Sequence, residues 1–122
     1  MGKWVADQVL DGALAVISTA TRMVAVNGQP ESYAAAWNGR LAEIALVSGD
    51  FSVGQGETSG RRIVLSAKED ATVLANGTAD HVALLHTGDE QLLYVTTCPP
   101  QVLGEGGAVS FEGWSVEIGA PL

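Results

Sequence analysis

The sequence predicts a mainly β domain, either an antiparallel β-sandwich or a barrel-like domain, with one N-terminal α-helix. Two observations favour this fold class. Short stretches of alternating apolar and polar residues recur along the last two-thirds of the chain, separated by Gly, Asn and Asp. One longer segment at the start has helical periodicity instead. Because no repeat or change of composition divides the chain, residues 1–122 are expected to form a single domain. The clearest stretches are Arg61–Ala67, His81–His86, Gln91–Cys98 and Ala108–Ile118.

Residues 3–19 are predicted to form the helix. Apolar residues recur there at steps of three and four, while Asp7 and Asp11 lie on the other side, and Trp4 is expected to anchor the start. Such a stripe is typical of a helix that packs on a sheet. The stripe comprises Val5, Val9, Leu10, Ala13, Leu14 and Ile17.

Turn signals divide the segment after the helix. A strand at 21–26 should end at Asn27-Gly28, and Pro30 should precede a short helical turn at 31–37. Between turns, 41–47 could be helix or strand, and its short length favours strand. A short strand is expected at 50–53, followed by an exposed glycine-rich loop at Gly54–Gly60.

The second half is expected to contain hairpins. We predict turns at Lys68–Asp70 and Asn76-Gly77, with a short strand at 72–74 between them, and a hairpin turn at Gly88–Glu90. Pro99-Pro100 should end its strand because proline cannot donate to a sheet, and Leu103–Gly107 should form the last turn. On the final strand Trp114, Val116 and Ile118 share one face. The residues expected to be buried are Leu14, Ile17, Val64, Leu84, Val95 and Trp114.

The charge of the chain disfavours two classes of partner. Six Lys and Arg against 14 Asp and Glu give a net charge of −8. Nucleic-acid binding needs a basic face, and so does a polybasic membrane-surface site. We therefore expect no nucleic-acid and no membrane partner. Asp7 and Asp11 also interrupt any signal-peptide core, and no apolar run reaches the roughly 18 residues of a membrane span.

Reactive residues are few. His81 and His86 are five residues apart on one predicted strand and point to opposite faces, so they cannot share a metal ion. The single cysteine, Cys98, is expected to be a buried apolar residue rather than a nucleophile, although a neighbouring histidine could contact it. The acids lie mostly in turns, and Gly54–Gly60 lacks a phosphate-binding pattern. We expect no cofactor, no metal and no enzymatic activity.

Partner contact is expected from turns and from the N-terminus. Lys3 and Trp4 lie in a short terminal segment, Met1–Trp4, and Trp37 lies beside a turn, where it is either partly buried or an anchor for another subunit. Arg61 and Arg62, the only adjacent basic pair in an acidic chain, could bind carboxylates of a partner or could simply be solvated.

Three segments resemble a group of small structural proteins of tailed bacteriophages and prophages. They are the opening Trp4–Leu14 running on to Thr21-Arg22, Gln29–Ala34, and Leu93–Thr97 followed by Trp114–Pro121. The interior segments Ser59–Arg62 and Ala75–Leu85 are also similar to that group. Where such proteins often carry a Cys-Ser pair, this chain has Val26-Asn27, so no role of a thiol transfers.

The resemblance implies a virion component, made in the host cytoplasm, that decorates and stabilises the shell of the major capsid protein. A homotrimer is the expected form, because such proteins often lie where three capsomers meet. Two alternatives remain: a tail or head–tail connector component, and a receptor- or carbohydrate-binding module at a tail tip. In the latter, the loops Gly54–Gly60 and Leu103–Gly107 would form the site with Trp37.

Overall fold

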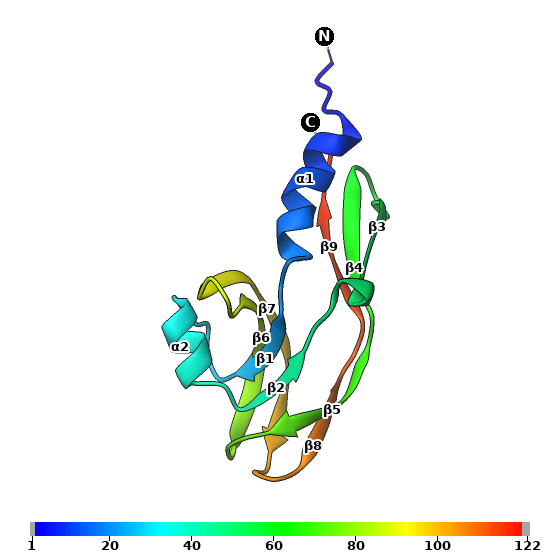
Figure 1. Ribbon diagram of the computed structural model, residues 1–122. Helices are drawn as coiled ribbons and strands as arrows, with labels where there is room; N and C mark the ends of the chain where they lie inside the picture. The colour runs from blue at the N-terminus through cyan, green and yellow to red at the C-terminus, as the bar shows by residue number, and fades with distance from the viewer. Residues whose placement is uncertain (1, 121–122) are drawn as a thin grey trace.

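The structure is a computed structural model that describes residues 2–120. It confirms a mainly β chain with an N-terminal helix and a short second helix (Figure 1). The helices are α1 (Asp7–Ile17), α2 (Tyr33–Asn38) and the 3-10 helix η1 (Ser48–Asp50). The strands are β1 (Arg22–Val26), β2 (Ala42–Ala45), β3 (Phe51–Gln55), β4 (Arg61–Leu65), β5 (Lys68–Val73), β6 (Gly77–His86), β7 (Gln91–Leu103), β8 (Ala108–Phe111) and β9 (Trp114–Ile118).

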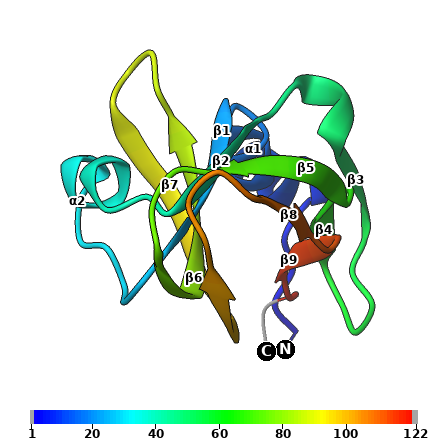
Figure 2. The same ribbon diagram turned by 90° about the horizontal axis from the view of Figure 1, so that it is seen from below.

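The strands form two antiparallel sheets. The larger sheet has six strands in the order β7-β6-β1-β2-β5-β8, and the smaller has three in the order β3-β4-β9. Seen from below, β6 and β7 lie on one side and β8 and β9 on the other, with β2 and β5 bridging them (Figure 2). The six-stranded sheet therefore curls into a half-barrel whose two edge strands, β7 and β8, do not pair with each other.

Both faces of the half-barrel are covered near its centre. Met23 and Ala25 on β1 point to the concave face, where they belong to the larger cluster of buried residues. Val24 and Val26 point to the opposite face and pack beneath α2 through Ala36. This strand is therefore an almost continuous apolar run, as expected for a strand buried on two sides.

Helix α1 packs on the three-stranded sheet through one narrow face. Leu14 is fully buried, Leu10 is nearly so, and Ile17 packs partly against the larger cluster. Arg61 on β4 adds a bidentate contact, with Nε and Nη2 donating to the Asp11 carboxylate at 2.8 and 3.3 Å. The helix begins at Asp7 rather than residue 3, and residues 2–6 belong to no helix or strand, with an extended backbone at Ala6. No side chain caps its first turn, and Trp4 at that end is exposed rather than anchored.

Strand β7 continues through Pro99 and Pro100, contrary to the expectation that these residues end it. β7 is an edge strand, so the missing N–H groups cost it no ladder hydrogen bond on its free side. The β6–β7 register also shifts there: Ala79 pairs with Gln101 and His81 with Thr97, which leaves three residues of β7 opposite Asp80. This bulge accommodates both prolines.

The stretch 108–118 is two strands rather than one. β8 pairs with β5 in the half-barrel, whereas β9 pairs with β4 in the smaller sheet. The chain crosses between the sheets at Glu112-Gly113. A Cβ atom at Gly113 would lie 3.0 Å from the Leu65 carbonyl oxygen, so glycine allows the close approach that the crossing needs. The expected alternation on β9 does hold, since Ser115 and Glu117 are exposed between partly buried neighbours.

Several further expectations were wrong in detail. Lys68–Asp70 is not a turn but the start of β5, with a bulge at which Asp70 has a φ of 61°. On β4, Ile63 and Leu65 are buried and Val64 is only partly so, because the opposite face of the strand meets the core. Leu84 is buried as expected, whereas Val95 and Trp114 are partly buried against the two clusters. The hairpin turn at Gly88–Glu90 and the helical turn after Pro30 are confirmed.

Candidate functional site

The main concave feature is a cleft of about 490 Å³ at the open seam of the half-barrel. Most of its lining comes from two segments, Thr96–Leu103 on β7 and Val109–Ser115 on β8 and β9. These segments include edge strands of both sheets, and the bulge at Pro99 lies within the first segment. The cleft is therefore the gap that a further strand would have to fill to close the barrel.

The floor of the cleft is apolar and its rim is polar. Leu103, Val109, Phe111 and Trp114 line it together with small hydroxyl side chains. The Trp114 ring meets Tyr94 of β7 edge-on at 5.8 Å between centroids, and its Nε1 is buried without a hydrogen-bond partner among residues 2–120. Glu112 is the one charged residue of the lining, and it is exposed. Such a site suits an apolar side chain accompanied by a cation.

Cys98 also lines the cleft, but it is a poor candidate for a nucleophile. Burial, together with the nearby Asp80 carboxylate, raises the pKa of the Cys98 thiol, which is the direction opposite to activation. His81 Nδ1 lies 2.7 Å from Asp80 Oδ1, and this contact, with the N–H of Gly28, lowers the pKa of Asp80. Within residues 2–120, no three His, Cys, Asp or Glu side chains gather closely enough to hold a metal ion.

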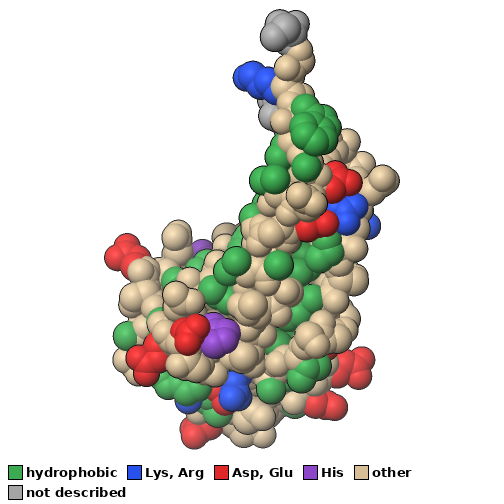
Figure 3. Space-filling view, turned by 45° about the horizontal axis from the view of Figure 1, so that its top comes forward, with side chains coloured by type: hydrophobic (Ala, Val, Ile, Leu, Met, Phe, Trp, Pro, Cys, Tyr) green, Lys and Arg blue, Asp and Glu red, His purple; other side chains and the backbone are tan. Residues whose placement is uncertain are grey.

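The N-terminal segment, from Trp4 through α1 to Val16, carries three of the six large exposed hydrophobic side chains among residues 2–120. Trp4, Val9 and Val16 are 83, 60 and 55% exposed. Figure 3 shows this end projecting beyond the body with hydrophobic side chains along it. Lys3 lies beside Trp4 and forms no ion pair with any residue in 2–120, whereas the other five Lys and Arg residues all bind carboxylates.

The remaining basic candidates are already engaged within the chain. Arg61 holds Asp11 of α1, which raises the pKa of its guanidinium group, and its side chain is 19% exposed. Arg62 Nη1 lies 2.8 Å from the Glu57 carboxylate in the β3–β4 hairpin. A partner carboxylate would have to share or displace these contacts. The structure thus gives Arg61 a role in attaching α1 that the sequence did not indicate.

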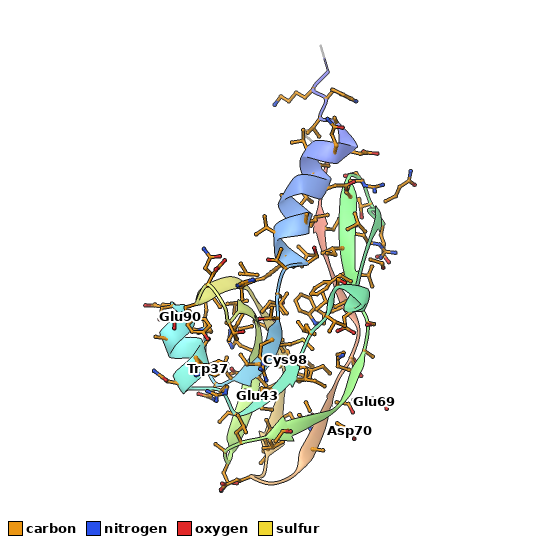
Figure 4. The ribbon with its side chains drawn as sticks, viewed as in Figure 1. Trp37, Glu43, Glu69, Asp70, Glu90 and Cys98 are labelled. Atoms are coloured by element: carbon orange, nitrogen blue, oxygen red, sulfur yellow. The ribbon has the colours of Figure 1, made fainter. Side chains whose placement is uncertain are left out.

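Trp37 is part of a packed cluster rather than an isolated exposed ring. It stacks on Tyr33 at 5.9 Å, and the Arg40 guanidinium lies 3.7 Å from the centroid of its ring. Arg40 also binds Glu43 at 2.6 Å, and Trp37 and Glu43 lie near each other beside α2, on the side of the molecule (Figure 4). This arrangement holds α2 on the sheet, and it leaves Trp37 only partly accessible.

The three features that could have formed a glycan or receptor site do not converge. The loop Gly54–Gly60 is the β3–β4 hairpin, in which Gly54 and Gln55 belong to β3, and it lies beside α1. Leu103–Gly107 forms the β7–β8 turn at the opposite end of the molecule, and Trp37 lies on α2 at the side (Figure 1). The structure therefore assembles no shared site from them.

Two functional features were missed from the sequence. Val9 was assigned with Leu10 and Leu14 to one stripe and Val16 was left aside, yet both valines point roughly 120 to 140° away from the buried leucines around the helix. The sequence did indicate a second apolar face on α1, because the helix has more apolar residues than one narrow buried face can hold. No sequence pattern indicated the cleft, because the cleft depends on which strands stay unpaired.

No protein-family model matches the chain, and no curated protein or solved structure shows significant similarity to it. None of the helices in residues 2–120 is long and apolar enough to cross a membrane.

Proposed function

We propose that this chain is a structural protein of a tailed-phage virion, which binds the assembled shell of the major capsid protein and stabilises it as a decoration protein. The observation that carries the proposal is the exposed apolar surface of the N-terminal segment, formed by Trp4 before α1 and by Val9 and Val16 on the helix. It is supported by the likeness of the N-terminal, central and C-terminal segments to phage structural proteins.

The chemistry of this end favours a protein partner. Exposed apolar side chains that lie together on one element are typical of an interaction site. Val9, Ala13 and Val16 follow one another at helical spacing along the outer face of α1, and all three are exposed. Fully burying a valine side chain contributes roughly 1.5 to 3 kcal/mol, so even a few such contacts per copy give useful binding. The net charge of −8 would repel nucleic acid.

Binding to undecorated particles tests the proposal. The double variant Val9→Ser/Val16→Ser should bind such particles at least about tenfold more weakly than the parent chain, because two apolar contacts are lost. Val47→Ser and Val102→Ser are matched controls, since both valines are exposed, at 65 and 81%, but lie on other elements. Equal loss in all variants, or in none, would contradict a docking role for α1.

Copy number distinguishes the positions within a virion. A decoration protein should be present in purified particles at a number comparable to that of the major capsid protein, as measured by quantitative mass spectrometry. A handful of copies per particle would assign the chain to the tail or the connector instead. Binding of the isolated chain to glycans, with no binding to shells, would support the receptor-binding alternative.

A further inference from the structure

The open cleft and the projecting N-terminal arm of this chain are complementary. We define the arm as residues 2–6, which precede α1 and belong to no helix or strand, with an extended backbone at Ala6. In Figure 1 the arm leaves the end of α1 that points away from the half-barrel, so it does not fill the cleft of its own chain. We propose that the arm of one copy binds, as an added strand, in the seam cleft of a neighbouring copy.

The shape of the cleft suits a strand. It is bordered by two edge strands that do not pair with each other, β7 and β8. Pro99 and Pro100 lack N–H groups, so that part of β7 cannot pair regularly with β8, and β8 keeps a free edge along which an added strand can pair. Free strand edges are templates for an added strand, and pockets beneath them select its side chains. A volume of about 490 Å³ is within the range of sites that bury a bulky group.

The residue pattern of the arm matches that site. In an extended segment, alternate side chains point to opposite sides, so Trp4 would point into the cleft while Lys3 and Val5 point to its rim. Trp4 would then meet the aromatic floor formed by Phe111 and Trp114. Its exposure of 83% in the single chain would be removed in the assembly.

The charges also match. Lys3 is the cation without an ion pair among the described residues, as shown above. Glu112, the charged residue at the cleft, forms no ion pair or hydrogen bond with any residue in 2–120 and is exposed. Copies of a chain with a charge of −8 repel one another, so a contact between copies benefits from opposite charges at the rim of the cleft. This argument favours a second copy over an acidic or neutral segment of another protein.

Such a contact joins different surfaces of the two copies. Contacts of this kind close into a ring when the rotation between copies allows it, and a ring of three matches the trimer expected for this chain. The inference goes beyond the proposed function, because it concerns how copies join one another and holds whether or not they bind a capsid. The contact between copies can therefore be disproved while the virion role stands, and the virion role can be disproved while the contact between copies stands.

Charge exchange in the full-length chain tests the contact. Lys3→Glu should weaken self-association about fivefold, measured by analytical ultracentrifugation, because a like-charge pair replaces the ion pair. Glu112→Lys should weaken it similarly, and the double variant should regain the parent value. Trp4→Ala should weaken it about thirty-fold, as for a buried aromatic anchor. Arg62→Glu is the control for a general effect of charge, and it should not be rescued by Glu112→Lys.

A cross-link tests the location. In an extended arm, position 2 would face the same side as Trp4, and Cys98 lines the cleft. Under oxidation at mildly alkaline pH, Gly2→Cys should form disulfide-linked species larger than a dimer, which Cys98→Ser abolishes. Glu90→Cys, on the exposed β6–β7 turn, is the matched control and should form no such species (Figure 4).

Three results would overturn the inference: a monomer at all concentrations up to about 100 µM, self-association that Trp4→Ala leaves unchanged, or Gly2→Cys that does not link to Cys98.

A synthetic peptide of residues 2–7 should also bind the full-length Trp4→Ala variant, whose own arm is impaired. If peptides from the major capsid protein bind there and the arm peptide does not, the cleft is a shell-binding site instead.

Discussion

The attachment of α1 can be tested through one buried residue. Leu14 is fully buried between α1 and the sheets, so Leu14→Ala removes three carbon atoms from a packed site. Substitutions of this kind cost about 2 to 5 kcal/mol, through lost transfer free energy and the cavity that remains. A domain of 122 residues is typically stabilised by about 6 to 18 kcal/mol. We therefore expect the free energy of unfolding to fall by about 3 kcal/mol, with the fold retained.

Val16 on the same helix provides the matched control. Its side chain is 55% exposed, and alanine has the higher helix propensity, so Val16→Ala should change the free energy of unfolding by less than about 0.5 kcal/mol. Urea unfolding of both variants, at one protein concentration because any self-association adds stability, gives the two values. With an m-value of about 1.5 kcal/mol/M, Leu14→Ala should lower the midpoint by about 2 M. A shift below about 0.5 M, or equal shifts for both variants, would refute the docking of α1 through Leu14.

Three further predictions follow from local contacts. The pKa of Asp50 lies below its ordinary value of 3.8, mainly because it accepts the N–H of Val47, so its carboxylate stabilises the fold above that pH. In urea unfolding, Asp50→Asn should therefore be less stable at pH 7, and its deficit should shrink as the pH falls below about 4. Gly60 has a φ of 70°, and a Cβ atom there would overlap backbone, so Gly60→Ala should lower the thermal midpoint strongly, whereas Gly54→Ala, with open space around it, should not. Iodoacetamide should alkylate Cys98 slowly at pH 8, and Asp80→Asn should accelerate the reaction, because the Asp80 carboxylate contributes to the raised thiol pKa; equal rates would contradict that assignment.

The sequence by itself determined the local elements of this protein. Periodicity marked the segment that contains α1, and turn residues marked the β6–β7 hairpin at Gly88–Glu90. The alternation at Trp114, Val116 and Ile118 also predicted the faces of β9 correctly. These features depend on residues close together in the chain, where propensity and pattern act directly.

Tertiary structure decided how those elements combine. The prolines of β7 are tolerated because the strand lies at a sheet edge. Residues 108–118 divide at Gly113 because β8 pairs with β5 in one sheet and β9 pairs with β4 in the other. The packing of α1 decides which face of β4 is buried. It also brings Arg61 beside Asp11. The cleft exists because β7 and β8 remain unpaired. Each of these outcomes depends on residues far apart in sequence, whose contacts are set by burial and strand order, and a local pattern carries no information about either.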